Sequence, residues 1–491
     1  MGMPAPLASA RERRKGQLAA IDFDRFRLCP QAANEAEGKP SVARLEDGGF
    51  VRPLIPAALA LLLLSVAGPA LADDEAAGKD QDYAIHGQET FVLQANPAFH
   101  SPYQGPNSLS PRPHAKETFD LTLYVGFRPW KGAEIWVNPE IDQGFGLSDT
   151  LGIAGFPSGE AYKVGKWAPY PKLPRWFYRQ TIGLGGGSEK VDADLNQLGG
   201  HQSKNRLVLT LGKFSVVDIF DTNEEAHDPR SDFMNWTIID AGTFDYAANA
   251  WGYTYGAAAE LYAGQWAIRA GAFDLSKVPN SEELDPTFGQ YELDGEIEHR
   301  HSIAGQPGKL KVTVYLNHGR MGRFSDAIRL AQLSGEPADI VAVRRVQDRT
   351  GISFNFEQQI SKAVSLFAKG GVTNGNIEPY EFSDVDRTIA AGATIKGSSW
   401  GRADDLVGVA GVINGITRIH QEFLNAGGLG ILVGDGKLPH PGAEEILEAY
   451  YDVSLAKPLH LSIDAQFVSH PGYNRDRGPV PIGAVRLHVQ F

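Results

Sequence analysis

Apolar and polar residues alternate strictly over the end of the chain, from Pro481 to Phe491. The apolar positions of one parity are Val485, Leu487, Val489 and Phe491, and the polar positions of the other parity are Arg486, His488 and Gln490. Successive side chains of a β-strand point to opposite faces, so this alternation predicts a strand with one apolar and one polar face. The strand ends on an aromatic residue with no polar tail, whereas chain ends in water usually fray.

Fifteen further stretches alternate in the same way, which makes sixteen in all. They lie near 83–94, 117–129, 132–142, 175–185, 205–216, 249–262, 265–274, 288–301, 309–319, 349–358, 362–373, 386–397, 405–414, 444–455, 458–468 and 481–491. Each is about as long as a tilted strand must be to cross a bilayer. The sequence therefore predicts an all-β protein, a transmembrane antiparallel β-barrel of about 16 strands.

Short and long connections alternate along these stretches. The short ones include Trp130-Lys131, Ala263-Gly264, 359–361 and Lys457, and the long ones are 95–116, 143–174, 217–248, 320–348 and 415–443. A barrel with mostly short periplasmic turns and long outer loops requires this alternation, whereas a soluble sandwich mixes loop lengths. The connection 186–204 is long where a short one is expected, so the sequence leaves 16 and 18 strands open.

A short apolar run, Leu54–Val66, lies between Arg52 and the small residues around Ala72. This arrangement is typical of a signal peptide, and the run is short for a transmembrane helix; a buried core helix or a membrane anchor is the alternative. We assign 51–72 to the signal peptide, 73–82 to a short periplasmic segment and 83–491 to the outer-membrane barrel. Residues 1–50 would be a mis-assigned upstream extension, with initiation near Val51, or a disordered one.

The composition and the motifs of the chain argue against several classes of function. The chain is acidic, with a formal net charge of −13, which argues against nucleic acid because phosphate binding needs clustered Lys and Arg. Cys29, the only cysteine, precedes the cleavage site, so the mature chain has no disulfide or thiolate metal site. The histidines lack metal-ligand spacing, and the sequence holds no nucleophile elbow, zinc-protease or P-loop pattern. We therefore expect no metal, no other cofactor and no enzymatic activity.

Residues 205–274 carry a run of motifs, Leu209–Asp221, His227–Trp236 and Asp245–Gly256. This run resembles the carbohydrate-selective porins of the OprB family, and Asn474–Val480 followed by the terminal strand is similar to the last loop of that family. The terminal Phe491 resembles the assembly signal of outer-membrane barrels. The resemblance implies a sixteen-stranded outer-membrane barrel through which small sugars diffuse passively.

A sugar channel needs acidic, basic and amide groups with an aromatic face or two, all binding weakly, because a tight site would trap the solute. The polar parity of several predicted strands supplies such groups. The candidate pore-lining residues on strands are Glu134, Trp136, Asn138, Glu140, Arg269, Glu292 and Asp294, with Lys311, Thr313, Tyr315 and Asn317 on the next strand. Any water-filled barrel has a polar interior, so each of these is more simply read as solvated lining than as a sugar contact.

Loop 217–248 is the stronger candidate for the constriction. It brings Asp228, Arg230, Asp232, Asn235 and Trp236 close together in sequence. Folded into the lumen, the loop would narrow the pore and present these groups to the solute; on the surface, pairing of Asp228 with Arg230 would only pin it. Near its exit, Trp251 and Tyr253 share a parity, and for them we favour the aromatic girdle at the membrane interface.

Three other functions remain open. Arg128, Arg179, Arg230, Arg269 and Arg486 could form a basic ladder, which would suit anionic sugars or polysaccharide. A hydrolase could use paired carboxylates such as Asp228 with Asp232 or Glu134 with Glu140, although no motif supports it. A plugged barrel could serve in adhesion.

The expected partners are small carbohydrates, outer-membrane lipid and the barrel-assembly machinery acting on the strand that ends in Phe491. With an even strand number, both mature termini would face the periplasm. The sequence leaves open which sugar is preferred and whether the barrel is a monomer or a homotrimer.

Overall fold

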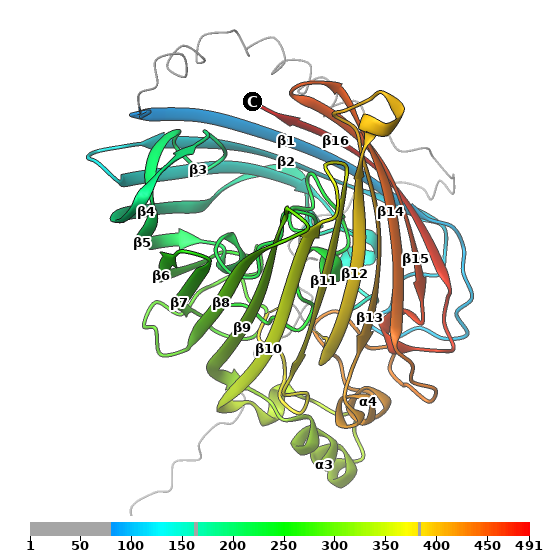
Figure 1. The fold of residues 1–491 in the computed structure, drawn as a ribbon. Coiled ribbons are helices and arrows are strands. Elements are labelled where there is room, and N and C mark those ends of the chain that lie inside the picture. The colour runs from blue at the N-terminus through cyan, green and yellow to red at the C-terminus, as the bar shows by residue number, and fades with distance from the viewer. Residues whose placement is uncertain (1–79, 162–164, 382–383) are drawn as a thin grey trace, which may run out of the picture. The chain divides into compact units, whose positions relative to one another are not determined.

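The computed structural model describes residues 80–161, 165–381 and 384–491, and within them sixteen antiparallel strands close one barrel (Figure 1). Each strand pairs with its neighbours in the chain, and β1 pairs with β16. The strands are β1 (Tyr83–Asn96), β2 (His114–Phe127), β3 (Ala133–Gly144), β4 (Lys166–Val191), β5 (Gly200–Phe214), β6 (Thr254–Ala263), β7 (Trp266–Asp274), β8 (Tyr291–Ile303), β9 (Gln306–Met321), β10 (Arg345–Gln359), β11 (Val364–Thr373), β12 (Arg387–Lys396), β13 (Leu406–Gly415), β14 (Glu444–Ala456), β15 (Leu459–Ser469) and β16 (Val480–Gln490). The predicted fold class and strand count are confirmed.

The proposed signal peptide at 51–72 and the upstream extension 1–50 lie outside the described residues, as does nearly all of the segment 73–82.

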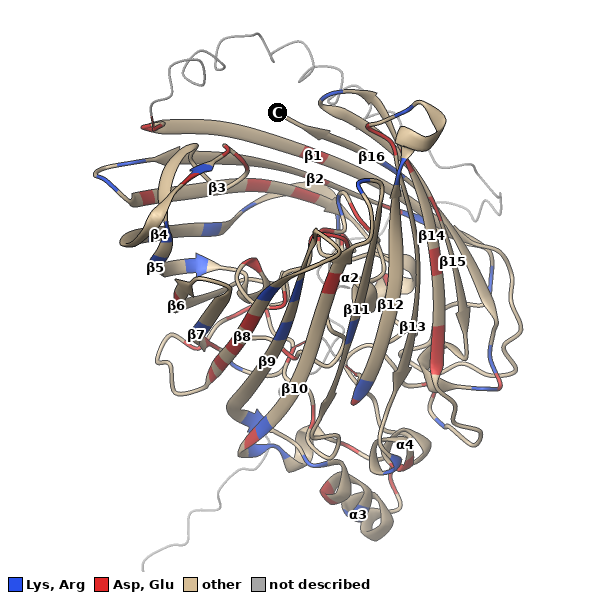
Figure 2. Ribbon diagram, in the orientation of Figure 1, with Lys and Arg blue, Asp and Glu red and all other residues tan. Residues whose placement is uncertain are grey.

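The alternation of side chains separates an outer from an inner face of the barrel. On β8, Leu293 and Ile297 are 46% and 52% exposed, whereas Glu292, beside Leu293 in the chain, is fully buried inside. Figure 2 shows the acidic positions of β8 beside the basic positions of β9. Because the outward side chains are apolar, the outer face suits lipid, and the polar inner face suits a lumen.

Aromatic side chains ring the outer face near the strand ends where both termini of the barrel lie. Tyr83, Phe127, Trp130 and Trp266 are all more than half exposed. Trp and Tyr are enriched at such positions in membrane barrels because their rings are apolar and their tips are polar.

The seam between β1 and β16 closes on the last residue of the chain. The N–H of Phe491 donates to the carbonyl of Gly87 at 3.0 Å, and the N–H of Gly87 donates to the carbonyl of Phe491 at 2.9 Å. A Cβ at position 87 would lie 2.6 Å from the Phe491 ring. Gly87 is therefore required for the ring to lie against the strand, and the described barrel closes without a free strand edge.

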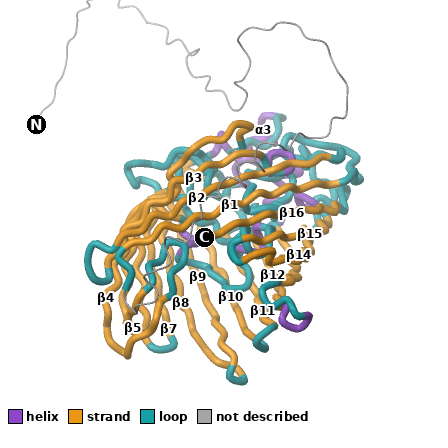
Figure 3. The backbone as a smooth tube through the Cα atoms, turned by 90° about the horizontal axis from the view of Figure 1, so that it is seen from above, coloured by secondary structure: helices purple, strands orange, loops and turns teal. Residues whose placement is uncertain are grey.

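Long loops and helices gather at the end of the strands opposite to the termini (Figures 1 and 3). The helical segments are η3 (Leu147–Thr150), η4 (Val216–Asp218), α2 (Trp236–Ile239), α3 (Phe324–Ser334), η5 (Val341–Val343), α4 (Arg418–Asn425) and η7 (Pro471–Tyr473), with η6 (Gly397–Trp400) in a turn at the other end. Of the described helices, none has the length and apolarity needed to traverse a bilayer. The loop-length alternation predicted from the sequence is confirmed, and we call the two ends the loop end and the terminal end.

The connection that broke the alternation has a simple explanation. β4 and β5 remain paired from Trp176–Lys213 to Val191–Gly200, so the turn between them spans only 192–199. The extra residues lengthen two existing strands, and the count of sixteen stands.

Candidate functional site: a channel through the barrel

The connection between β5 and β6, residues 215–253, folds into the barrel and is here called the lumen loop. Phe220, Phe233 and Phe244 of this loop are fully buried. Phe233 packs edge-on against Tyr450 of β14 with ring centroids 5.0 Å apart, and Phe244 packs against Tyr315 of β9 at 5.6 Å. The lumen loop therefore forms a hydrophobic core with the inner faces of distant strands.

Polar side chains of the barrel wall hold the backbone of the lumen loop. The Glu448 carboxylate accepts the N–H groups of Met234 and Asn235 at 2.5 and 3.0 Å. Glu296 and Glu357 accept further N–H groups of the loop, whereas Asn317, Asn355 and Lys369 donate to its carbonyls. Since a buried polar group must be paired, these contacts fix the loop and also satisfy the wall.

Arg486 of β16 binds three backbone carbonyls of the lumen loop. Its Nη1 donates to the carbonyls of Pro229 and Asp232, both at 2.7 Å, and its Nη2 donates to the carbonyl of Ser231 at 2.9 Å. One guanidinium thus clamps the turn that carries the predicted constriction residues.

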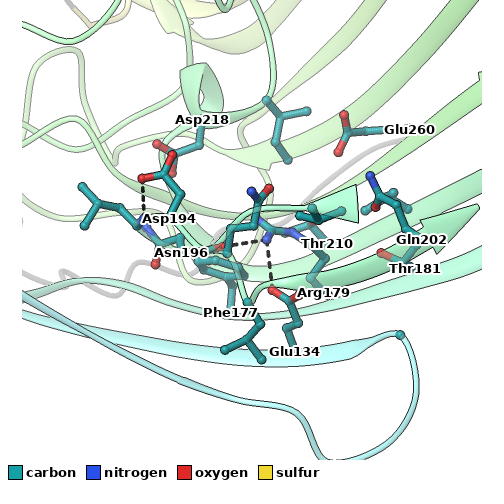
Figure 4. A pocket seen from close by; sticks show the side chains of 18 of the residues that line it. Glu134, Phe177, Arg179, Thr181, Asp194, Asn196, Gln202, Thr210, Asp218 and Glu260 are labelled. Carbon is teal, nitrogen blue, oxygen red and sulfur yellow. Dashed lines mark hydrogen bonds and ion pairs between the residues drawn. The ribbon is translucent and has the colours of Figure 1, made fainter. Parts of the chain in front are cut away.

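Two cavities remain between the lumen loop and the wall. The larger, about 960 Å³, lies toward the terminal end and is bounded mainly by β2–β7 (Figure 4). The smaller, about 180 Å³, lies toward the loop end. Five residues border both cavities, namely Arg175, Asp218, His227, Asp228 and Arg230. These five residues lie between the two cavities, and we refer to them as the constriction.

The charged groups of the constriction form ion pairs. Arg175 binds the Asp218 carboxylate through two hydrogen bonds, of 2.8 and 2.6 Å. Arg230 lies 3.2 Å from Asp120, 3.1 Å from Glu160 and 3.7 Å from Asp228. The Asp228 side chain keeps 41% of its surface exposed, so this pair still faces the solute.

The larger cavity continues this mixture of charges. Arg269 contacts Glu260, Glu296 and Glu298 at 3.0, 2.6 and 2.9 Å. Arg179 donates to Glu134 at 3.4 Å, as Figure 4 shows. Basic and acidic side chains therefore lie next to each other along the wall, and no large part of it carries charge of one sign.

The smaller cavity carries aromatic faces. Phe156 and Trp236 stack with centroids 5.3 Å apart, and Tyr253 lies under the Arg175 guanidinium at 4.9 Å. Trp251 lines the same cavity and donates from its indole N–H to Tyr170 at 3.1 Å. The girdle interpretation of Trp251 and Tyr253 is wrong: β6 begins at Thr254, so both residues belong to the lumen loop and face inward.

Five of the candidate pore-lining residues border a cavity, namely Glu134, Asp228, Arg230, Trp236 and Arg269. The other eleven lie outside both linings, namely Asp232, Asn235, Trp136, Asn138, Glu140, Glu292, Asp294, Lys311, Thr313, Tyr315 and Asn317. Asp232 accepts the N–H groups of His227 and Asp228, both at 3.0 Å, and Asn235 caps α2. Glu140 contacts Thr122 and Lys172, and Trp136 stacks on His86.

Sequence reasoning missed Arg175, Asp218 and His227. Arg175 is the first residue of the predicted strand 175–185, and Asp218 and His227 both lie within the predicted loop 217–248. No local pattern distinguished them from solvated residues, because Arg175 and Asp218 meet only when the lumen loop folds against β4.

A family model for the carbohydrate-selective porins of the OprB family matches residues 106–491. The chain belongs to this family. The high-pH structure of Pseudomonas putida OprB is similar to it with a TM-score of 0.62 at 15% identity, covering 84% of this chain and 94% of that one. The outer membrane channel DcaP of Acinetobacter baumannii aligns with a TM-score of 0.46 at 10% identity, covering 84% and 97%. No curated protein sequence matches the chain. Fold and family together make this OprB-family chain a carbohydrate-selective porin of the bacterial outer membrane.

Burial shifts the pKa values of two neighbouring lumen-loop groups, Asp240 and His227, in opposite directions. Burial raises the pKa of Asp240, which borders the smaller cavity, to about 7; Lys369 opposes this shift and Asp221 adds to it. Burial lowers the pKa of the neighbouring His227 to about 4, and Lys369 acts in the same direction. Between these values Asp240 takes up a proton while His227 stays neutral.

We therefore expect the preference for cations over anions to fall as the pH is lowered from about 8 to about 6. Asp240 loses its negative charge in this range, and His227 does not change its charge. Reversal potentials across a KCl gradient measure this preference. Asp240→Asn should start from the lower preference and respond less to pH in this range, keeping only the part that falls near pH 6, where burial raises the pKa of Asp232 to about 6. An Asp240→Asn channel with the full pH response would assign the titration to another group.

Proposed function

We propose that the protein lets small neutral sugars diffuse passively from outside the cell into the periplasm through the two cavities. One observation supports the proposal: an aromatic cavity and a charge-balanced cavity share five lining residues, so the two would form successive parts of one path. A sugar would enter at the loop end, lay its apolar ring face on the half-buried Trp251, and pass Asp228 and Arg230.

The ion pairs explain how such a path would bind sugars without trapping them. A sugar hydroxyl both donates and accepts hydrogen bonds, so it can bridge Arg230 and Asp228 at their exposed edges. Because each charge already has a partner, a hydroxyl exchanges with an existing contact and gains little net free energy. Weak contacts repeated along the wall favour passage over retention.

An anionic solute is the second candidate, and one observation favours it. Arg128, Arg179, Arg230 and Arg269, four of the five arginines of the proposed ladder, border the same larger cavity. Arg486 is the exception, since it clamps the lumen loop. Against this candidate, each of the four lies within 4 Å of a carboxylate: Arg128 near Asp80 and Glu134, Arg179 near Glu134, Arg230 near Asp120 and Arg269 near Glu296.

We propose that the terminal end faces the periplasm. Short turns and both termini of the barrel share that end, as expected for barrels inserted from the periplasm. Phe491 would then be presented to the assembly machinery on the periplasmic side. We extend the proposal to this interaction and leave the choice between monomer and homotrimer to measurement.

Liposome swelling with the purified porin tests the cargo. We expect glucose and disaccharides to enter faster than size-matched uronates, because the wall offers balanced rather than positive charge. Empty liposomes and liposomes with a heat-denatured sample serve as controls. Swelling in uronates that exceeds swelling in glucose would favour the anion channel, and no swelling in any sugar would overturn the porin function.

A further inference from the structure

A two-stranded ribbon extends from the barrel rim at the terminal end. Pairing of β3 with β4 ends at Ala133–Gln180, and pairing of β5 with β6 ends at Arg206–Tyr262. Beyond these pairs β4 and β5 pair only with each other, as far as Val191 and Gly200. We call residues 184–205 the rim hairpin.

Glycines bend the rim hairpin where it leaves the barrel. Gly185, Gly186 and Gly187 have φ values of +89°, +80° and +91°, which L side chains rarely adopt. The register between β4 and β5 shifts on both sides of Gly185. Such β-bulges at a barrel rim bend the strand and redirect the chain beyond them.

The bend carries the turn of the rim hairpin into the lumen. Asn138 of β3 donates from its Nδ2 to the Oδ1 of Asn196 at 2.8 Å, and Arg179 donates to the carbonyl of Asn196 at 2.8 Å (Figure 4). Asn138 faces inward and is fully buried, so the turn reaches past the rim. Leu198, only 1% exposed, packs in the interior beside it.

The turn also binds the start of the described chain. The N–H of Gln81 donates to the carbonyl of Gly199 at 2.9 Å, and the N–H of Gly199 donates to the Gln81 side chain at 2.8 Å. Asp80 accepts the N–H of His201 at 2.9 Å. The rim hairpin is therefore held from β3, from β4 and from the segment before β1.

These contacts place the turn in the wall of the larger cavity. Asp194, Leu195, Asn196, Gln197 and Leu198 all border it, as do Ser188 and Val191 on the arm. A solute that moves through this cavity from Arg230 toward the terminal end would pass this turn.

We infer that the rim hairpin forms a second constriction, at the exit of the channel, which limits the size of the solutes that pass. The inference rests on the proposed function only in treating the cavities as a path for solutes. A hairpin that merely braces the segment before β1 would make the same contacts with Gln81 and would leave conductance unchanged when removed. The two roles therefore differ in a measurement that needs no sugar.

The test replaces residues 184–205 with an Asn-Gly turn that joins Gly183 to Arg206, a paired position suited to a two-residue hairpin. We expect the single-channel conductance in KCl to rise about twofold, because an ion path widens when a segment is removed from it. The size limit for swelling in oligosaccharides should rise as well. The matched control replaces the turn 397–405, which lies at the same end but borders neither cavity, and should leave conductance unaltered.

A second pair of variants keeps the hairpin and changes its bulk. Leu195→Trp, at a residue that borders the cavity, should lower the conductance, whereas Leu184→Trp, at an exposed residue outside the lining, should not. Unchanged conductance in both the shortened channel and Leu195→Trp would overturn the inference and leave the bracing role. Because both readouts use KCl, a channel that failed to pass sugars would still report on the rim hairpin.

Discussion

Replacing Arg486 with alanine is expected to raise the single-channel conductance several-fold and to weaken the discrimination between small and large sugars. The substitution removes the donors of three carbonyls in the turn 229–232. Each buried carbonyl left without a donor costs about 1–3 kcal/mol, so the turn gains stability by moving to water. Asp228 directly precedes that turn and Arg230 lies within it, so both would leave the constriction with it.

Planar-bilayer recordings measure the conductance, and swelling with sugars of increasing size measures the discrimination. Arg486→Lys keeps the charge and part of the hydrogen bonding, so its channel should lie between the wild type and the alanine variant. Arg320→Ala, at an exposed position near the end of β9, controls for the loss of an arginine as such. If the alanine channel conducted like the wild type, Arg486 would not hold the lumen loop in place.

Arg230→Ala should change the selectivity of the constriction more than its width. Arg230 is the cation among Asp120, Glu160 and Asp228. Partial burial opposes ionisation of Asp228, but the Arg230 guanidinium and N–H, together with His488 and His227, outweigh it and hold the pKa of Asp228 below its usual range. Removing the guanidinium leaves acidic groups in excess, so the preference for cations should rise.

The same variant should bind sugars about two- to tenfold more weakly, because one exchanging hydrogen bond with a net value of about 0.5–1.5 kcal/mol is lost from the path. Block of the ion current by added sugar gives the affinity, and reversal potentials give the ion selectivity. Arg230→Lys restores the charge but not the forked geometry, so it should recover the ion selectivity better than the sugar affinity. Unaltered sugar block in Arg230→Ala would place the binding path away from this residue.

The strands and their faces could be read from the sequence because the physical cause is local. A spanning strand meets lipid on one side and the barrel interior on the other, so its neighbours in sequence differ in polarity, as Glu292 and Leu293 do. The rule failed as soon as the strand ended. Tyr253 precedes β6 by one residue, and there the parity no longer says which side chain meets lipid.

The role of the inward polar residues could not be read in the same way. Glu448 is inward by parity, but its partners are the N–H groups of Met234 and Asn235, far away in the chain. Solvated lining and contact with a solute were the two roles considered for such residues, and anchoring a loop is a third. Arg175 and Asp218 escaped notice for the same reason, since their pairing exists only in the folded lumen loop.

The hydrogen bonds between Phe491 and Gly87 have a consequence for assembly. β1 and β16 are neighbours in the barrel although about 400 residues of chain separate them, whereas every other pairing joins strands that follow each other in the chain. Their pairing therefore closes the longest loop and carries the largest loss of chain entropy among the pairings of the described barrel. We expect this seam to form last during assembly and to open first under stress, so that Phe491 lies at the weakest joint of the ring.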